Sequence, residues 1–120
     1  MNKILKITIL LISFTVFQIT AVKAEIRSEI VNYQIAGQAF TGYLSYDDTI
    51  TGKRPGVLVV HEWWGHNAYA RKRADMLAAM GYTAFALDMY GSGKLAEHPD
   101  DAQKFMQATL ADMNVAEARF

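Results

Sequence analysis

The sequence predicts an α/β fold in which a β-hairpin precedes one strand–helix–strand unit and a further helix. Three observations predict this fold. Two segments of alternating polarity flank a turn at residues 36–37, as is typical of an antiparallel hairpin. Continuous apolar runs at 56–60 and 83–87 are typical of strands in a parallel sheet. Between these runs, residues 68–80 have the apolar periodicity of a helix.

The hairpin comes first along the chain. Ser28–Ile35 and Phe40–Tyr46 alternate between polar and apolar residues, and Ala36-Gly37 between them favours a tight turn. A polar loop over 47–54 follows. The run Gly56–Val60 has no alternation, so we expect this strand to be buried on both faces of the sheet.

The helix predicted over Ala68–Met80 has recognisable ends. Asn67 is a residue type that caps helix N-termini, and Gly81 is one that closes C-termini. Arg71 and Asp75 are four residues apart, so we expect an ion pair on the exposed side of the helix. The face expected to pack on the sheet contains Ala70, Ala74, Leu77 and Ala78.

A second buried strand is predicted at Thr83–Leu87, and the unit then forms a right-handed βαβ crossover. Asp88 follows it, and we expect its side chain to cap the turn rather than to face a ligand. After a loop over 90–97, Pro99 fits the first position of another helix. The negative charges of Asp100 and Asp101 would interact favourably with the positive N-terminal end of its dipole. The apolar stripe predicted for that helix contains Ala102, Phe105, Met106 and Leu110.

Two parallel strands and a hairpin are too few for a complete α/β sheet, whose central strands need helices on both faces. The sequence is therefore expected to be the opening part of a larger domain. Residues 25–120 are assigned to that domain.

Residues 1–24 have the layout of a secretory signal peptide. Lys3 and Lys6 precede an apolar stretch at 7–19, and Val22-Lys23-Ala24 places small residues where cleavage occurs. The stretch is shorter than the approximately 20 apolar residues of a membrane span. We therefore expect an exported protein, periplasmic or secreted, with no stable membrane anchor after cleavage. The remaining chain has nine basic and twelve acidic residues.

Composition excludes several functions. The chain has no cysteine, so it contains no disulfide and no thiol nucleophile. Its zero net charge gives no electrostatic basis for binding nucleic acid. His61 and His66 are five residues apart in a loop, whereas zinc proteases place their histidines four apart on a helix. Gly91-Ser92-Gly93-Lys94 lacks the upstream glycine and following hydroxyl of a phosphate-binding loop.

The candidate site is the loop 61–67, with the sequence His-Glu-Trp-Trp-Gly-His-Asn. It follows a parallel strand, and ligands of open α/β sheets bind beyond the carboxyl ends of the strands. In α/β-hydrolase architecture the equivalent loop supplies a backbone N–H to the oxyanion hole, which here would be that of Trp63. Other interpretations stay open: Glu62 as a solvated carboxylate, His61 as a structural histidine, and both tryptophans as cover for the sheet edge.

Three blocks in order resemble the dienelactone hydrolase family: Gly56–Asn67, Ala74–Tyr82 and Ala86–Gly91. The resemblance implies a three-layer α/β-hydrolase-like sandwich with a Cys-His-Asp triad, all three members of which lie beyond Phe120. It implies that Glu62 interacts with the nucleophilic cysteine.

The resemblance also places the Trp63 N–H in the oxyanion hole and Trp64 in the wall of the substrate pocket. Family members bind the substrate carboxylate with an arginine shortly after the Asp-x-Tyr turn. Ser92 stands near that position and Lys94 follows, so both are candidate substrate-binding residues.

The function that the resemblance implies is hydrolysis of a small-molecule carboxylic ester or lactone through an acyl-enzyme, with no metal and no organic cofactor. The alternative is a non-catalytic exported fragment or a small-ligand-binding protein. The substrate and the oligomeric state are not indicated.

Overall fold

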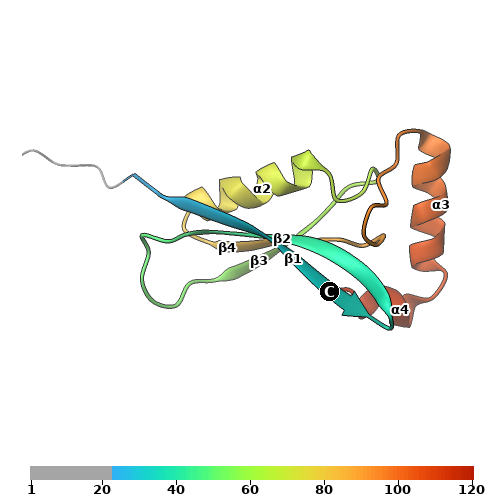
Figure 1. Ribbon diagram of the computed structural model, residues 1–120, viewed down its shortest axis with the longest axis horizontal. Coiled ribbons are helices and arrows are strands. Elements are labelled where there is room, and N and C mark those ends of the chain that lie inside the picture. The colour runs from blue at the N-terminus through green and yellow to red at the C-terminus, as the bar shows by residue number, and fades with distance from the viewer. Residues whose placement is uncertain (1–22) are drawn as a thin grey trace, which may run out of the picture.

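The computed structural model describes residues 23–120, and its centre is a four-stranded sheet in the order β1-β2-β4-β3 (Figure 1). β1 (Ile26–Ile35) and β2 (Gln38–Asp47) pair antiparallel along their whole length. β3 (Gly56–Val60) and β4 (Thr83–Leu87) pair parallel, as predicted. The predicted signal peptide lies almost wholly outside the described residues. Within the described part of the chain, no helix has the length and apolar character needed to cross a bilayer.

The hairpin turn has the backbone that its sequence favours. Ala36 and Gly37 both have positive φ, 49° and 79°. Positive φ at both central residues is typical of the type I′ turn, whose twist matches that of the strands it joins. The hairpin then joins the βαβ unit through antiparallel pairing of β2 with β4, centred on Leu44 and Phe85. This pairing makes one sheet from two segments far apart in sequence.

Helix α2 (Ala68–Ala79) covers one face of the sheet (Figure 1). Its predicted caps are confirmed: the Asn67 side chain accepts hydrogen bonds from two N–H groups of the first turn, and Gly81 has a φ of 92°. The helix face is built from alanines, which allow the helix axis to approach the sheet closely. Buried alanines of helix and β4 form this core with Tyr43, Val59 and Leu77: they are Ala70, Ala74, Ala84 and Ala86.

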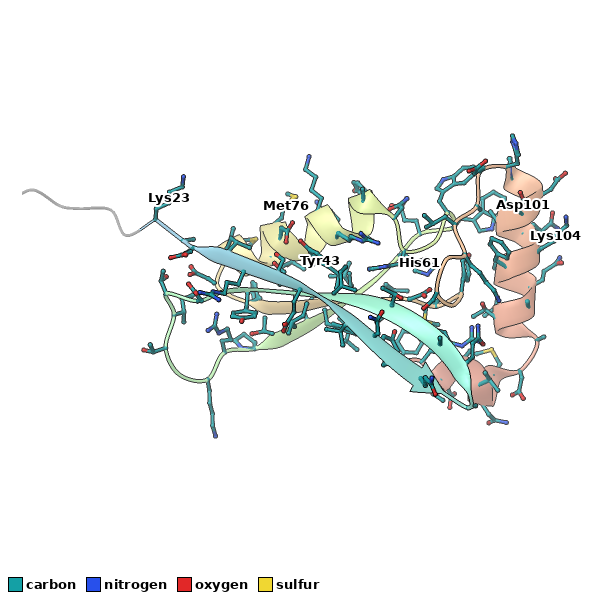
Figure 2. All side chains as sticks on the ribbon, in the orientation of Figure 1. Lys23, Tyr43, His61, Met76, Asp101 and Lys104 are labelled. Atoms are coloured by element: carbon teal, nitrogen blue, oxygen red, sulfur yellow. The ribbon has the colours of Figure 1, made fainter. Side chains whose placement is uncertain are left out.

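The expected ion pair between Arg71 and Asp75 is wrong. Asp75 turns towards the hairpin, where its carboxylate accepts hydrogen bonds from Ser45 at 2.8 Å, Ser28 at 2.9 Å and Tyr43 at 3.1 Å. Figure 2 shows Tyr43 between the sheet and α2. Three hydroxyl donors on the sheet stabilise a carboxylate better than one solvated partner on the helix surface does.

β3 is an edge strand, so the prediction that both of its faces are buried is wrong. Val57 and Val59 are half-buried, on the face where Val59 packs with α2. Leu58 and Val60, on the other face, are 52% and 47% exposed. Burying both faces requires a second helix layer and a further strand, and residues 23–120 supply neither.

The remaining helices lie beyond one end of the sheet (Figure 1). α3 (Pro99–Leu110) begins at Pro99 as predicted, with acidic residues in its first turn. Phe105 packs on Leu87, Met89 and Tyr90, but Leu110 is exposed, which corrects one member of the predicted stripe. Thr109 takes the buried position instead, and its hydroxyl lies within hydrogen-bond distance of the Phe105 carbonyl at 2.9 Å and the Met89 carbonyl at 3.2 Å. The short α4 (Met113–Glu117) was not predicted.

Candidate functional site

Two loops meet at the carboxyl ends of the parallel strands: residues 61–67 after β3 and residues 88–97 after β4. Parallel strands end at the same edge of a sheet, so the loops that follow them are neighbours. A backbone hydrogen bond of 3.0 Å from the Ala96 N–H to the Trp64 carbonyl joins them. The candidate loop is therefore held by its neighbour as well as by β3.

His61 occupies a buried position between the two loops, at the end of the sheet nearest α3 (Figure 2). Its Nε2 accepts a hydrogen bond of 3.0 Å from the Met89 N–H, and its Nδ1 lies 2.7 Å from the Glu62 carbonyl oxygen. Both ring nitrogens are thus occupied by backbone groups. The interpretation of His61 as a hydrogen-bonded structural histidine is supported, and the ring is not placed to act as a base.

Tyr90 holds the candidate loop from the other side. Its hydroxyl donates to the Trp63 carbonyl at 3.1 Å, and its ring makes an edge contact with His61 at 4.7 Å between centroids. Burial raises the pKa of the Tyr90 hydroxyl, so the group stays protonated and remains a donor.

Asp88 caps the turn that carries Tyr90, as predicted. Its Oδ1 accepts from the Tyr90 and Gly91 N–H groups at 2.9 and 3.0 Å, and its Oδ2 accepts from the Thr41 N–H at 3.4 Å. The residue is only 3% exposed. The carboxylate therefore joins the turn after β4 to the hairpin and serves the architecture of the site rather than a ligand.

Glu62 and Trp63 line one open cleft of about 250 Å³ at this edge. Its other walls come from the loop after β4 and from α3: Met89, Tyr90, Met106, Thr109 and Leu110. No residue between 23 and 120 accepts a hydrogen bond from the Trp63 N–H. The cleft is thus lined by an acidic residue, by a residue whose backbone N–H has no acceptor and by mostly apolar walls, which is a composition suited to a small organic ligand.

The other candidate residues lie outside that cleft. Trp64 is 38% exposed and packs against Trp63 at 6.0 Å between ring centroids. The Ser92 hydroxyl is 2.7 Å from the Thr41 hydroxyl on the hairpin. Lys94 is exposed and lines neighbouring hollows. The structure therefore brings Glu62 and Trp63 together, and it does not bring Ser92 or Lys94 to them.

Comparison with known proteins agrees with this architecture. The sequence profile of the Dienelactone hydrolase family matches residues 40–119, which include most of β2, the whole βαβ unit and both loops of the site. The chain belongs to the dienelactone hydrolase family.

A curated relative in Aquifex aeolicus, a putative carboxymethylenebutenolidase, is 38% identical over 81 residues, covering 65% of this chain and 33% of the relative. Among solved structures, a protein designated m3DLH superposes with a TM-score of 0.73 at 33% identity, covering 78% of this chain and 39% of that one. A dienelactone hydrolase-like promiscuous phosphotriesterase from metagenomic libraries superposes with a TM-score of 0.72 at 29% identity, with the same coverage. This dienelactone hydrolase-family chain spans about a third of the length of its curated relative.

Two site residues of this dienelactone hydrolase-family chain were missed by sequence reasoning. Tyr90 was assigned only to a loop, although a tyrosine two residues after the capping Asp88 was a signal that its position is constrained. Gly65 has a φ of 96°, and a Cβ there would lie 2.7 Å from the Lys94 carbonyl oxygen. Only glycine fits this turn without strain.

His66 was likewise given no role, and it is buried beside Arg71 and Asp88 in a hollow of about 130 Å³. Its Nε2 has no hydrogen-bond partner among the described residues. Burial, together with the charge of Arg71, lowers the pKa of His66 below its ordinary value of 6.5.

We expect the folded state to lose stability as the pH falls from about 7.5 to about 5.5, because the unfolded chain then binds a proton at His66 that the folded chain does not. Stability at the higher pH is retained because the imidazole is neutral in both states. Urea denaturation at the two pH values measures the difference. A His66→Gln variant should show a smaller dependence on pH, and the exposed His98→Gln should show an unchanged one. Equal slopes in all three proteins would contradict the assignment.

Proposed function

We propose that this chain supplies the oxyanion and glutamate part of a hydrolase site that cleaves a carboxylic ester or lactone. Membership of the dienelactone hydrolase family supports a hydrolase in general. The observation that carries the proposal is the Glu62-Trp63 pair, which lines one cleft at the carboxyl end of β3 with an uncommitted Trp63 N–H.

The proposed chemistry is nucleophilic acyl transfer. A cysteine thiolate attacks the carbonyl carbon, and the carbonyl oxygen becomes an oxyanion. The oxyanion then collapses and the ester C–O bond breaks, so that the alkoxide is protonated and leaves as the alcohol, or stays attached as a hydroxyl when the substrate is a lactone. Water hydrolyses the resulting acyl-enzyme to the carboxylic acid and frees the thiol. The Trp63 N–H donates to the oxyanion, a contact that is worth roughly 3–4 kcal/mol where a single donor has been removed from other hydrolases. Glu62 contributes a carboxylate beside the nucleophile. The nucleophile must come from elsewhere, since these 120 residues contain no cysteine.

The test joins this chain to the rest of a family member. In a chimera, residues 40–119 replace the matching segment of the metagenomic phosphotriesterase relative. The 120-residue chain alone should not hydrolyse dienelactone or p-nitrophenyl acetate. The chimera should hydrolyse both, and Glu62→Gln should lower its kcat/KM by about 100-fold, the low end of losses for positioned acid–base groups.

A matched control is Glu117→Gln, which changes an exposed carboxylate on α4 that is retained in the chimera and should leave the rate unchanged. A chimera with the circular dichroism spectrum of its folded parent but no activity would refute the proposal. So would a Glu62→Gln chimera as active as the unmodified one. Turnover by the 120-residue chain alone would show that the nucleophile is not a cysteine.

A further inference from the structure

The two peptide groups on either side of Trp63 are each held by a buried side chain. The Glu62 carbonyl, in the peptide before Trp63, lies 2.7 Å from His61 Nδ1. The Trp63 carbonyl, in the peptide after it, accepts from the Tyr90 hydroxyl at 3.1 Å. Both holding residues are buried, and the two bonds are partly shielded from solvent. An otherwise irregular loop is thus fixed at the residue that carries the uncommitted N–H.

The tautomer of His61 follows from its partners. Met89 donates its N–H to Nε2, so Nε2 carries no proton. The proton of the neutral ring is therefore on Nδ1 and is donated to the Glu62 carbonyl. Asp88 Oδ1 lies 4.0 Å from Nε2, beyond hydrogen-bond reach, and already accepts two N–H groups. His61 is therefore bonded to both loops: it accepts from Met89 in the loop after β4 and donates to the Glu62 carbonyl in the loop after β3.

Because the peptide group is planar, the contacts of the Glu62 carbonyl also set the direction of the Trp63 N–H. In a trans peptide the C=O and N–H groups point in opposite directions. Because the Glu62 carbonyl is directed at His61 and also accepts from the Gly65 N–H at 3.2 Å, the Trp63 N–H is directed away from both. The bond from the Tyr90 hydroxyl fixes the Trp63 carbonyl in the following peptide group. With the peptide groups on both sides held, rotation about the Trp63 φ and ψ bonds is restricted.

We propose that His61 and Tyr90 are positioning residues that orient the Trp63 N–H for its contact with the oxyanion. This inference rests on the proposed function. Donors that are already oriented need no rearrangement as charge develops, so loosening them lowers kcat more than it changes KM.

The test uses two variants of His61, each of which keeps the hydrogen bond made by one ring nitrogen and loses the bond made by the other. In His61→Asn the amide nitrogen can stand where Nδ1 stands and keep the bond to the Glu62 carbonyl. In His61→Gln the amide oxygen can replace Nε2 and accept from Met89, but the donor to Glu62 is lost. Tyr90→Phe removes only the hydroxyl bond to Trp63. The control is Tyr69→Phe, which removes a hydroxyl from an exposed tyrosine on α2.

In the active chimera we expect His61→Gln and Tyr90→Phe each to lower kcat about 10-fold with KM changed less than about twofold. His61→Asn should recover most of that loss, and Tyr69→Phe should match the unmodified protein. Unchanged kcat in both His61→Gln and Tyr90→Phe would overturn the inference. A loss in His61→Asn as large as in His61→Gln would overturn the role of Nδ1.

A second readout does not depend on activity. Long-range ¹H–¹⁵N spectra of the full 120-residue chain should report His61 as the Nδ1–H tautomer. The Nε2–H tautomer would overturn the inference. An inactive chimera together with the Nδ1–H tautomer would refute the proposed ester or lactone hydrolysis while supporting the placement of the loop by His61.

Discussion

Replacing Asp88 with alanine should lower the free energy of unfolding of the full chain by about 3–5 kcal/mol. The variant leaves the Tyr90 and Gly91 N–H groups without an acceptor in a buried turn and also removes the weaker contact to Thr41. Each buried N–H left unsatisfied costs about 1–3 kcal/mol. Urea denaturation followed by circular dichroism measures the change.

Two further variants test whether the lost free energy of unfolding comes from the turn N–H groups that Asp88 binds. Asp88→Asn keeps an oxygen that can accept from both turn N–H groups, so we expect it to lose about 1–2 kcal/mol. Asp100→Ala removes an exposed carboxylate from the first turn of α3 and should cost no more than about 1 kcal/mol. If Asp88→Ala proved no more destabilising than Asp100→Ala, the carboxylate would not be what holds the turn after β4.

The second large effect is expected at Gly65. Gly65→Ala should destabilise the chain by about 2–5 kcal/mol, combining the cost of a positive φ, about 1–2 kcal/mol, with that of an overpacked contact, about 1–3 kcal/mol. The added Cβ would lie 2.7 Å from the Lys94 carbonyl oxygen, a backbone atom that cannot move without moving its loop. The loops of the site should therefore separate, and activity of the chimera should fall with stability.

Gly52→Ala is the matched control for the backbone cost. Gly52 has a φ of 98°, nearly that of Gly65, and nothing within 4 Å of the added Cβ. Thermal unfolding of both variants isolates the contact with Lys94 as the difference between them. Equal losses in the two variants would mean that the loops after β3 and β4 are not in firm contact.

Features encoded by neighbouring residues could be predicted from the sequence. β3 and β4 have the predicted bounds, because a glycine, a proline or an aspartate marks the ends of short apolar runs. Asn67 and Asp88 were assigned correctly as caps, since each accepts N–H groups only two or three residues away. The position of the candidate loop follows from the same local pattern.

Features that depend on distant partners could not be predicted. Asp75 has an ordinary helical partner at Arg71 in the sequence, yet the hydroxyls that bind it lie 30 to 47 residues away. The exposure of β3 depends on which strands flank it, and no run of five residues specifies that. The bonds from Met89 to His61 and from Tyr90 to the Trp63 carbonyl form only when the two loops meet, so neither His61 nor Tyr90 was assigned to holding Trp63.

The outer edge of β3 has a chemical consequence of its own. Gly56–Val60 has no strand beside it on that side within residues 23–120, and apolar side chains lie on its open face. An unpaired row of backbone N–H and C=O groups next to apolar surface recruits any extended segment that matches it. Where this edge of β3 stays open, it is a template on which identical molecules can add to one another, and Leu58 and Val60 add apolar surface beside it.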